Sequence, residues 1–258
     1  HMFDKPEFHE RFFKPFYDYH LKGIDNGVMD DPKVTIFVRG INKYRNEKNW
    51  PIERAKYISY YLSSNNSGSV NSLNDGSLTL NNPQDTNENS ANKTSYEYPD
   101  PEWGLGVVAM GKFGPDPVRR VLTFTSDVLS KNTEIAGPIV LKLFVSSDQP
   151  DTDFIIKLSD QFPLTDIKQN QGHQPTFLTL TKGWLKASHR NKDKMKSKKY
   201  KPFYHHKNPQ PLIPNKIYSF DIEIHPTAHV FMKEHRIRLE ISNGDSPLTD
   251  AVFTHQYM

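Results

Sequence analysis

The 258-residue chain contains no cysteine. This absence excludes structural disulfide bonds, thiolate catalysis and zinc held by cysteine. It fits a reducing compartment such as the cytoplasm without establishing one. The apolar runs are also far shorter than the ~20 residues that a bilayer-crossing helix needs, so no membrane partner is expected. The opening His1-Met2 resembles a cloning remnant, so the missing signal peptide says nothing of the natural protein.

Familiar catalytic and nucleotide-binding motifs are absent as well. The chain has neither GxSxG, the turn that carries a nucleophilic serine, nor the phosphate loop GxxxxGK[ST]. Residues 104–111, GLGVVAMG, lack the third-glycine spacing and the βαβ context of a dinucleotide loop. No cofactor is therefore expected.

Two groups of side chains could suggest a metal. His225 and His229 have the i,i+4 spacing of helical ligands, but Pro226 and flanking strands remove the helix, which favours ordinary edge histidines. Asp148, Asp151 and Asp153 could bind calcium or cap a turn between strands, and the turn is favoured. No metal site is expected.

Positive charge is concentrated in one short stretch. Residues 182–201 hold eight lysines and Arg190 against the single acid Asp193. The remaining 24 basic and 29 acidic residues carry a net charge of −5, whereas the whole chain carries +3. The basicity therefore belongs to one loop, 190–201, and a solvated connection is favoured over a nucleic-acid site, although Tyr200, Phe203 and Tyr204 follow it. No nucleic-acid partner is expected.

The first residues have helical periodicity. Residues 7–22 place Phe8, Phe12, Phe13 and Phe16 on one side, and Gly23 is a typical C-terminal stop. Pro15 predicts a kink or a new helix start there. A helix this aromatic needs a large partner surface.

After Gly23 the apolar period becomes two. Clear alternation occurs at 34–38, 139–145, 154–158, 220–224 and 237–241, and further strands are expected within 56–62, 119–126, 176–188 and 229–232. About ten strands, separated by turn residues, predict an all-β, jelly-roll-type antiparallel β-sandwich with a short N-terminal helix. Residues 63–95 differ, because 17 of these 33 are Asn or Ser. We expect a disordered surface insertion there, with SLTL at 77–80 as a brief edge strand.

The order of the strand motifs carries a resemblance. The motifs VTIFVRG, YPDPEW and VLTFTSDVL are followed by TEIAGPIVLKLFVSSDQPDTDFIIKLSD, LTKGWLKASHR and HRIRLEISNGDSP. They resemble the C-terminal region of the X-prolyl dipeptidyl-peptidase, cocaine esterase and α-amino acid ester hydrolase family. The resemblance covers the chain except the Asn/Ser insertion and the lysine run.

This resemblance implies a serine hydrolase whose Ser–Asp–His triad lies in an α/β-hydrolase domain. The chain resembles the region of such enzymes that lies after the catalytic histidine, so no catalytic residue is assigned, and His9 and His20 on the helix are rejected. We expect residues 1–23 to be the terminal helix of that missing domain and 24–258 the jelly roll. The missing domain is the expected partner, and a homo-oligomer stays open.

Two functions remain as alternatives. The chain is expected to be the non-catalytic domain of a hydrolase acting on esters or amides, inactive alone, which supports the catalytic domain and walls its substrate cleft. Trp103 and Leu105, in an apolar Gly-rich segment at 98–114, are the expected substrate-binding residues, although covering the sandwich core would explain them too. The alternative is an independent module binding carbohydrate or another ligand, for which Trp184, Tyr57, Tyr60 and Tyr61 could supply aromatics.

Overall fold

A helical segment precedes the strands. The structure, a computed structural model, describes residues 5–82, 93–98, 108–111, 114–164 and 174–244. Helix α1 (Pro6–Phe8) continues through the π-helical turn η2 (His9–Phe13) into α2 (Lys14–Lys22), and a 3₁₀ turn, η3 (Val28–Asp30), comes next. The predicted stop is confirmed, because Gly23 adopts φ 68° and its N–H bonds to the Tyr19 carbonyl at 3.1 Å. Pro15 stands in the first turn of α2, where a new start was expected.

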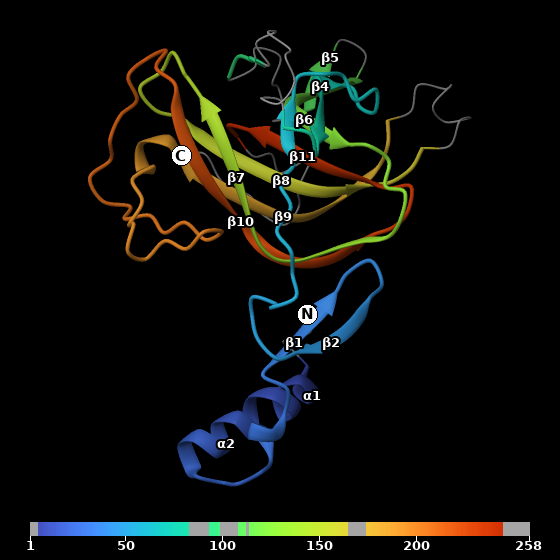
Figure 1. Cartoon of the computed structure of the whole chain (residues 1–258), viewed down its shortest axis with the longest axis vertical. Helices are drawn as coiled ribbons and strands as arrows, with labels where there is room; N and C mark the ends of the chain where they lie inside the picture. The colour runs from blue at the N-terminus through green and yellow to red at the C-terminus, as the bar shows by residue number, and fades with distance from the viewer. Residues whose placement is uncertain (1–4, 83–92, 99–107, 112–113, 165–173, 245–258) are drawn as a thin grey trace.

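A small hairpin connects the helices to the main sheet. Strands β1 (Val34–Val38) and β2 (Lys43–Glu47) form a two-stranded antiparallel sheet of their own. The backbone of Arg39 makes two hydrogen bonds with β10. The Arg39 N–H donates to the Ala228 carbonyl, and the Val230 N–H donates to the Arg39 carbonyl. Val38 packs on Ala228 and Val230 in a small separate apolar cluster. Figure 1 shows the hairpin between the helices and the large sheet.

The main sheet has the hydrogen-bonded order β3-β4-β6-β11-β8-β9-β10-β7, with β5 paired to β6. Its strands are β3 (Tyr61–Ser63), β4 (Ser72–Thr79), β5 (Val108–Gly111), β6 (Gly114–Ser126), β7 (Thr133–Val145), β8 (Asp153–Gln161), β9 (Phe177–Lys186), β10 (Tyr218–Phe231) and β11 (Arg236–Ser242). A 3₁₀ turn, η5 (Ala187–His189), follows β9. This is the predicted all-β, jelly-roll-type sandwich.

The sheet folds into two layers at one close contact. Strands β7 and β10 pair along almost their whole length, whereas β10 meets β9 only where Ile224 opposes Gly183. A Cβ on Gly183 would lie 2.1 Å from the Glu223 carbonyl oxygen, so the approach requires glycine. In Figure 1 the β7–β10 ribbon crosses over β8 and β9, which makes it the second layer.

The core forms between these layers from the alternating residues. Ile156, Ile222 and Phe220 are at most 1% exposed, and Phe154 packs against Phe220 with ring centroids 4.9 Å apart. The predicted apolar faces of β7, β8, β10 and β11 all contribute to the same cluster. Burial of alternate side chains is what the period of two predicts, so these strand assignments are confirmed.

Two features differ from the expectation. The segment 63–95 contains β4, which is longer than the expected edge strand, lies between β3 and β6, and pairs with β6 in parallel. It therefore corrects the expected disordered insertion for residues 63–82 and the purely antiparallel sheet, whereas residues 83–92 lie outside the described residues. The polar face of β8 and β11 is also covered rather than solvated, because Lys157, Arg238 and Glu240 are at most 4% exposed.

The buried charges on this face have partners. Arg238 donates to the Glu240 carboxylate at 2.6 Å and to the Gln161 side chain at 3.0 Å. Its guanidinium lies 4.2 Å from the ring centroid of Phe177. A buried arginine is tolerated when paired in this way, because the hydrogen bonds and the aromatic face offset its desolvation.

Candidate functional site

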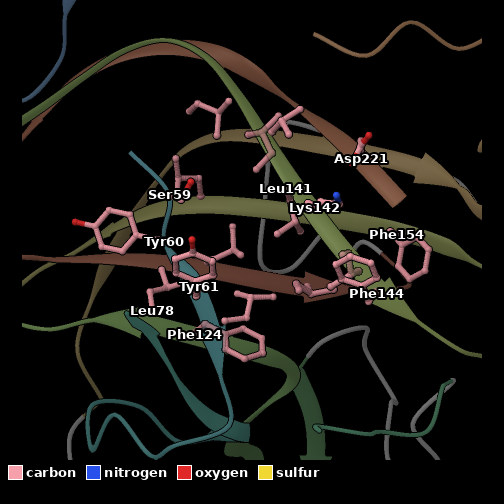
Figure 2. Close-up of a pocket in the computed structure, with 18 of the residues that line it drawn as sticks. Ser59, Tyr60, Tyr61, Leu78, Phe124, Leu141, Lys142, Phe144, Phe154 and Asp221 are labelled. Carbon is pink, nitrogen blue, oxygen red and sulfur yellow. The ribbon is translucent and has the colours of Figure 1, made fainter. Parts of the chain in front are cut away.

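A large hollow opens between the two layers. Strand β7 and residues 57–63 line two sides of it, and further lining side chains come from β4, β6, β8 and β11. Figure 2 shows several of these side chains. The apolar part of the lining includes Leu78 of β4, Phe124 of β6, Leu141 of β7 and Phe154 of β8. The volume of the hollow, about 3220 Å³, is several times the ~300–1,000 Å³ of a small-molecule pocket.

Tyrosines supply the polar groups of this hollow. Tyr60 and Tyr61 enter from residues 57–63, and Figure 2 shows both beside Leu78. Burial raises the pKa of Tyr60 and, more strongly, that of Tyr96. The Tyr96 hydroxyl donates to the Asn243 side chain, which in turn donates to the Asp153 carbonyl at 2.8 Å. These phenols stay protonated at neutral pH, so they serve as hydrogen-bonding groups and not as bases.

An ion-pair network closes the hollow near the hairpin. Arg45 of β2 donates to both carboxylate oxygens of Glu134 on β7, at 2.8 and 2.6 Å. Arg54 makes a second two-pronged pair with Glu47. The hydrogen bonds from Arg45 and Arg54 lower the pKa of Glu134 and Glu47, respectively. The network connects the β1–β2 hairpin to the main sheet. The only sequence pattern that could have indicated it is the charged residue at every second position of KYRNE, residues 43–47.

The opposite end is closed by the start of the basic loop. Lys192 pairs with Asp221 of β10, and the Tyr204 hydroxyl donates to the Asp221 carbonyl. Tyr57 stacks on Tyr200 with ring centroids 3.5 Å apart. Burial raises the pKa of Tyr204. This end of the hollow is a fixed junction between the loop, β10 and residue 57.

The described side chains that line the hollow include no pair of a nucleophile and a histidine base. Among the described residues that line the hollow there is no histidine to activate a serine. The nearest likeness to a triad lies elsewhere, where Asp160 pairs with His229 at 2.9 Å and with His235 at 2.8 Å. His229 is 1% exposed, so a substrate has no access to it.

The other sequence candidates have structural roles in the described part. The Asp151 side chain accepts the Thr152 and Ser188 N–H groups and lies 3.4 Å from Lys186. Burial alone would raise the pKa of Asp151, but the Ser188 hydrogen bonds and the Lys186 charge lower it. The carboxylate caps the turn at the start of β8, as favoured over calcium.

The two histidines of β10 differ from each other. His225 is exposed and packs edge-on against Trp184, as an edge histidine would. His229 was expected at an edge too, but it is buried and paired with Asp160, because β10 is covered on that face. The edge interpretation is therefore corrected for His229.

The expected aromatic and substrate residues do not form one site. Trp103 and Leu105 lie outside the described residues, although Tyr98, close before them in the chain, lines the hollow. Tyr57, Tyr60 and Tyr61 line it too, whereas Trp184 is on β9 against His225. The structure thus separates the four aromatics proposed for a carbohydrate site.

The described strands form a domain of the jelly-roll β-sandwich class. The family model described as X-Pro dipeptidyl-peptidase C-terminal non-catalytic domain matches residues 26–256, and the chain belongs to this family. Within the described residues, no helix combines the length and apolar character that crossing a bilayer requires.

Known relatives place this family among larger hydrolases. The chain is 30% identical to the cocaine esterase of a Rhodococcus species over 92% of its own length, and 27% identical to a putative serine esterase of Mycobacterium tuberculosis over 94%. It spans only 38% and 37% of those two proteins. Each is therefore much longer than the part that the chain matches.

Solved structures agree on the fold. A CocE/NonD family hydrolase from Staphylococcus aureus matches with a TM-score of 0.62 and 23% identity, over 93% of this chain and 38% of that one. An α-amino acid ester hydrolase matches with a TM-score of 0.53 and 21% identity, over 89% and 36%. The chain is the C-terminal domain type of this hydrolase family.

Proposed function

We propose that the chain is the domain that supports the α/β-hydrolase domain of a serine hydrolase acting on esters or amides, of dipeptidyl-peptidase or acyl-ester hydrolase type, and that it walls part of the substrate cleft. In this proposal residues 1–23 are the last helix of the hydrolase domain, and 24–258 are the jelly roll. The family and the partial coverage of its longer relatives support this division of labour.

The uncovered aromatic face of the N-terminal helices carries the proposal. None of the residues of α1, η2 and α2 is buried, and Phe12, Phe16 and Tyr17 are about half exposed. Phe12 and Phe13 both contact Phe8, with ring centroids 4.7 and 5.5 Å from that of Phe8. Such a cluster is stable in water only when another surface covers it, and a hydrolase domain would do so.

The hairpin offers a second contact on the same side of the molecule. Phe37 and Tyr44 are paired across β1 and β2 with ring centroids 5.1 Å apart, yet they are 44% and 62% exposed. Figure 1 shows helices and hairpin together at one end of the sandwich. The Arg45–Glu134 pair would hold this surface at a fixed angle to the hollow.

The first test is activity. The isolated chain is expected to hydrolyse p-nitrophenyl acetate no faster than a buffer blank, because its described part holds no triad. The natural gene is expected to encode a GxSxG segment upstream. Turnover by the isolated chain that survives repurification and is abolished by a serine-directed inhibitor would contradict the proposal, as would a natural gene without such a segment.

Trp103 and Leu105 remain the proposed wall of the substrate cleft. Trp103→Ala in the longer natural enzyme is expected to lower kcat/KM at least tenfold without changing the melting temperature of the isolated chain. Trp184→Ala is the matched control, because Trp184 is half exposed on β9. A loss of stability on the order of 3 kcal/mol in the isolated chain would instead make Trp103 a core residue.

The alternative of an independent carbohydrate module has less support. Sugar rings stack on free aromatic faces, and the Tyr57 face is already covered by Tyr200. Trp184 has no second aromatic of the predicted set beside it, since its ring contact is with His225.

A further inference from the structure

The basic loop differs from a loosely solvated connection in having a defined turn. The Asp193 carboxylate accepts the N–H groups of Met195 and Lys196 at 2.9 and 3.1 Å. The Asp193 N–H donates to the Phe203 carbonyl at 2.8 Å, and the Ser197 side chain accepts the Phe203 N–H at 3.0 Å. The hydrogen bonds that Asp193 accepts lower its pKa and fix residues 194–196 as a turn.

An apolar side chain stands at the tip of this turn between two lysines. Met195 is 94% exposed, the highest exposure among the large hydrophobic residues of the described chain. Lys194 and Lys196 flank it and are exposed, as are Lys198, Lys199 and Lys201. Within the described structure, none of these five lysines has a carboxylate at ion-pair distance. Their charge is available to a partner.

The loop also stands apart from the rest of the chain. Residues 190–201 hold seven basic residues against one acid, whereas the other residues carry a net charge of −3, so an anionic surface would be attracted to the loop and repelled elsewhere. Figure 1 shows the loop in orange at the β7–β10 side of the sandwich, far from the helices and the hairpin. A partner could reach it while a hydrolase domain covers the helices.

The aromatic residues of the loop argue against nucleic acid. Single-stranded nucleic acid binds by stacking bases on free aromatic faces. The Tyr200 ring is stacked on Tyr57 and has the Lys199 ammonium 5.0 Å from its centroid. Phe203 likewise has the Lys196 ammonium 5.0 Å from its centroid. The free group at the tip is a flexible thioether, which inserts among lipid chains more readily than it stacks on a base.

We propose that the turn 193–197 docks the domain on an anionic phospholipid surface. Met195 enters the boundary between headgroups and acyl chains, and Lys194, Lys196 and Lys198 contact the lipid phosphates. The contact is reversible, because one methionine buries little apolar area and the charge term is screened by salt. This inference stands independently of the proposed catalytic partner.

The test is co-sedimentation of the full chain with vesicles in 0.1 M salt. Partition is expected to be strong on phosphatidylcholine containing about 30% phosphatidylglycerol and weak on phosphatidylcholine alone. Each lysine near the surface contributes about fivefold, so Lys194→Gln/Lys196→Gln should lower partition on the order of 25-fold. Met195→Ser should lower it severalfold with the charge unchanged.

The matched control removes two exposed lysines away from the loop. Lys33→Gln/Lys131→Gln changes net charge by the same amount and should leave partition nearly unchanged. Circular dichroism confirms that each variant is folded. The proposal is overturned if both vesicle types bind equally, if the control pair loses as much as the loop pair, or if Met195→Ser has no effect. Tighter binding to a 20-base-pair DNA duplex than to the anionic vesicles, at the same salt, would assign the loop to nucleic acid instead.

Discussion

The β-sandwich and the N-terminal helices are both rich in phenylalanine, but only the sandwich buries it. Phe220 of β10 is 1% exposed and Phe231 is 0% exposed, whereas Phe12 and Phe16 of the helices are each 48% exposed. Both regions have their expected local pattern, with a period of two in the strands and a helical period in residues 7–22. The difference therefore lies in the partner that each apolar face meets.

The comparison shows why local pattern alone does not determine burial. Strands β4 and β6 to β11 place buried apolar side chains in one core between the two layers of the same chain. The helical segment Pro6–Lys22 is near the length at which an isolated helix is marginal in water, and within the described part of the chain none of its residues is buried. Most helices in proteins gain their stability by packing an apolar face on another surface, and in our proposal the hydrolase domain provides that surface.

The largest effect is expected from truncating matched phenylalanines in the two regions. Phe220→Ala should lower the free energy of unfolding of the isolated chain by about 3–5 kcal/mol, because it leaves a cavity in the core. Phe12→Ala should change it by less than about 0.5 kcal/mol, as at other exposed positions. Urea unfolding measures both. Similar losses for the two variants would show that the helices already pack within the chain.

A smaller effect is expected at the corner where the two layers meet. Gly183→Ala would bring a methyl group 2.1 Å from the Glu223 carbonyl oxygen, so β9 and β10 must separate. We expect a loss of about 1–3 kcal/mol, typical of overpacking. Leu178→Ala on the same strand is the control, since Leu178 is 41% exposed and should cost less. An unchanged unfolding midpoint for Gly183→Ala would contradict the two-layer corner.

The link between hairpin and sandwich should be weaker still. A double-mutant cycle with Arg45→Gln and Glu134→Gln is expected to give a coupling of about 0.2–1 kcal/mol, because both side chains are partly exposed. The cycle provides its own single-variant controls. A coupling indistinguishable from zero would mean that this ion pair does not fix the hairpin on β7.

The same ion-pair network predicts that the stability of the chain decreases slightly at acid pH. Hydrogen bonds from Arg45 and Arg54 lower the pKa of Glu134 and Glu47 below the ~4.3 of an unfolded glutamate. Their contribution is therefore fully present above about pH 4.3 and is lost as pH falls through the lowered folded-state pKa. Thermal unfolding between pH 7 and pH 3 should show a smaller decrease for Glu134→Gln than for the unmodified chain. A decrease of equal size would remove Glu134 from this role.

The core strands and the helix stop could be predicted from sequence because their signals are local. The alternation of Phe220, Ile222 and Ile224 identifies a half-buried strand without knowledge of its neighbours. Gly23 likewise identifies a helix end through its own backbone freedom. The family resemblance added the expected order of these elements, and the match over residues 26–256 agrees with it.

Strand β4 could not be predicted because its support is distant in sequence. Ser72–Thr79 has few apolar side chains, which is why the segment resembled a solvated insertion. In the structure the Asn74 side chain accepts the Thr123 N–H at 2.7 Å, at the irregularity in the β4–β6 pairing. The Asp75 carboxylate organises the preceding turn by accepting the Gly68 N–H at 2.6 Å. Polar side chains thus replace the apolar signal that prediction relies on.

The hollow was missed for a related reason. Its walls come from residues 57–63, β4, β6 and β7, and only the folded sandwich brings these together. The Arg45–Glu134 pair that closes one end joins residues 89 positions apart. The charges are visible in the sequence, but their pairing depends on the register of the hairpin and its docking on β10.

Amide hydrogen exchange of residues 5–24 tests the central claim most directly. It should be measured in the isolated chain and in a longer natural protein that carries the hydrolase domain, with β8 and β11 as internal references. The account predicts nearly unprotected helices in the isolated chain and slowing on the order of 100-fold or more in the longer protein, with the two strands protected in both. Equal protection of the helices in the two proteins would contradict the claim that a hydrolase domain covers their aromatic face.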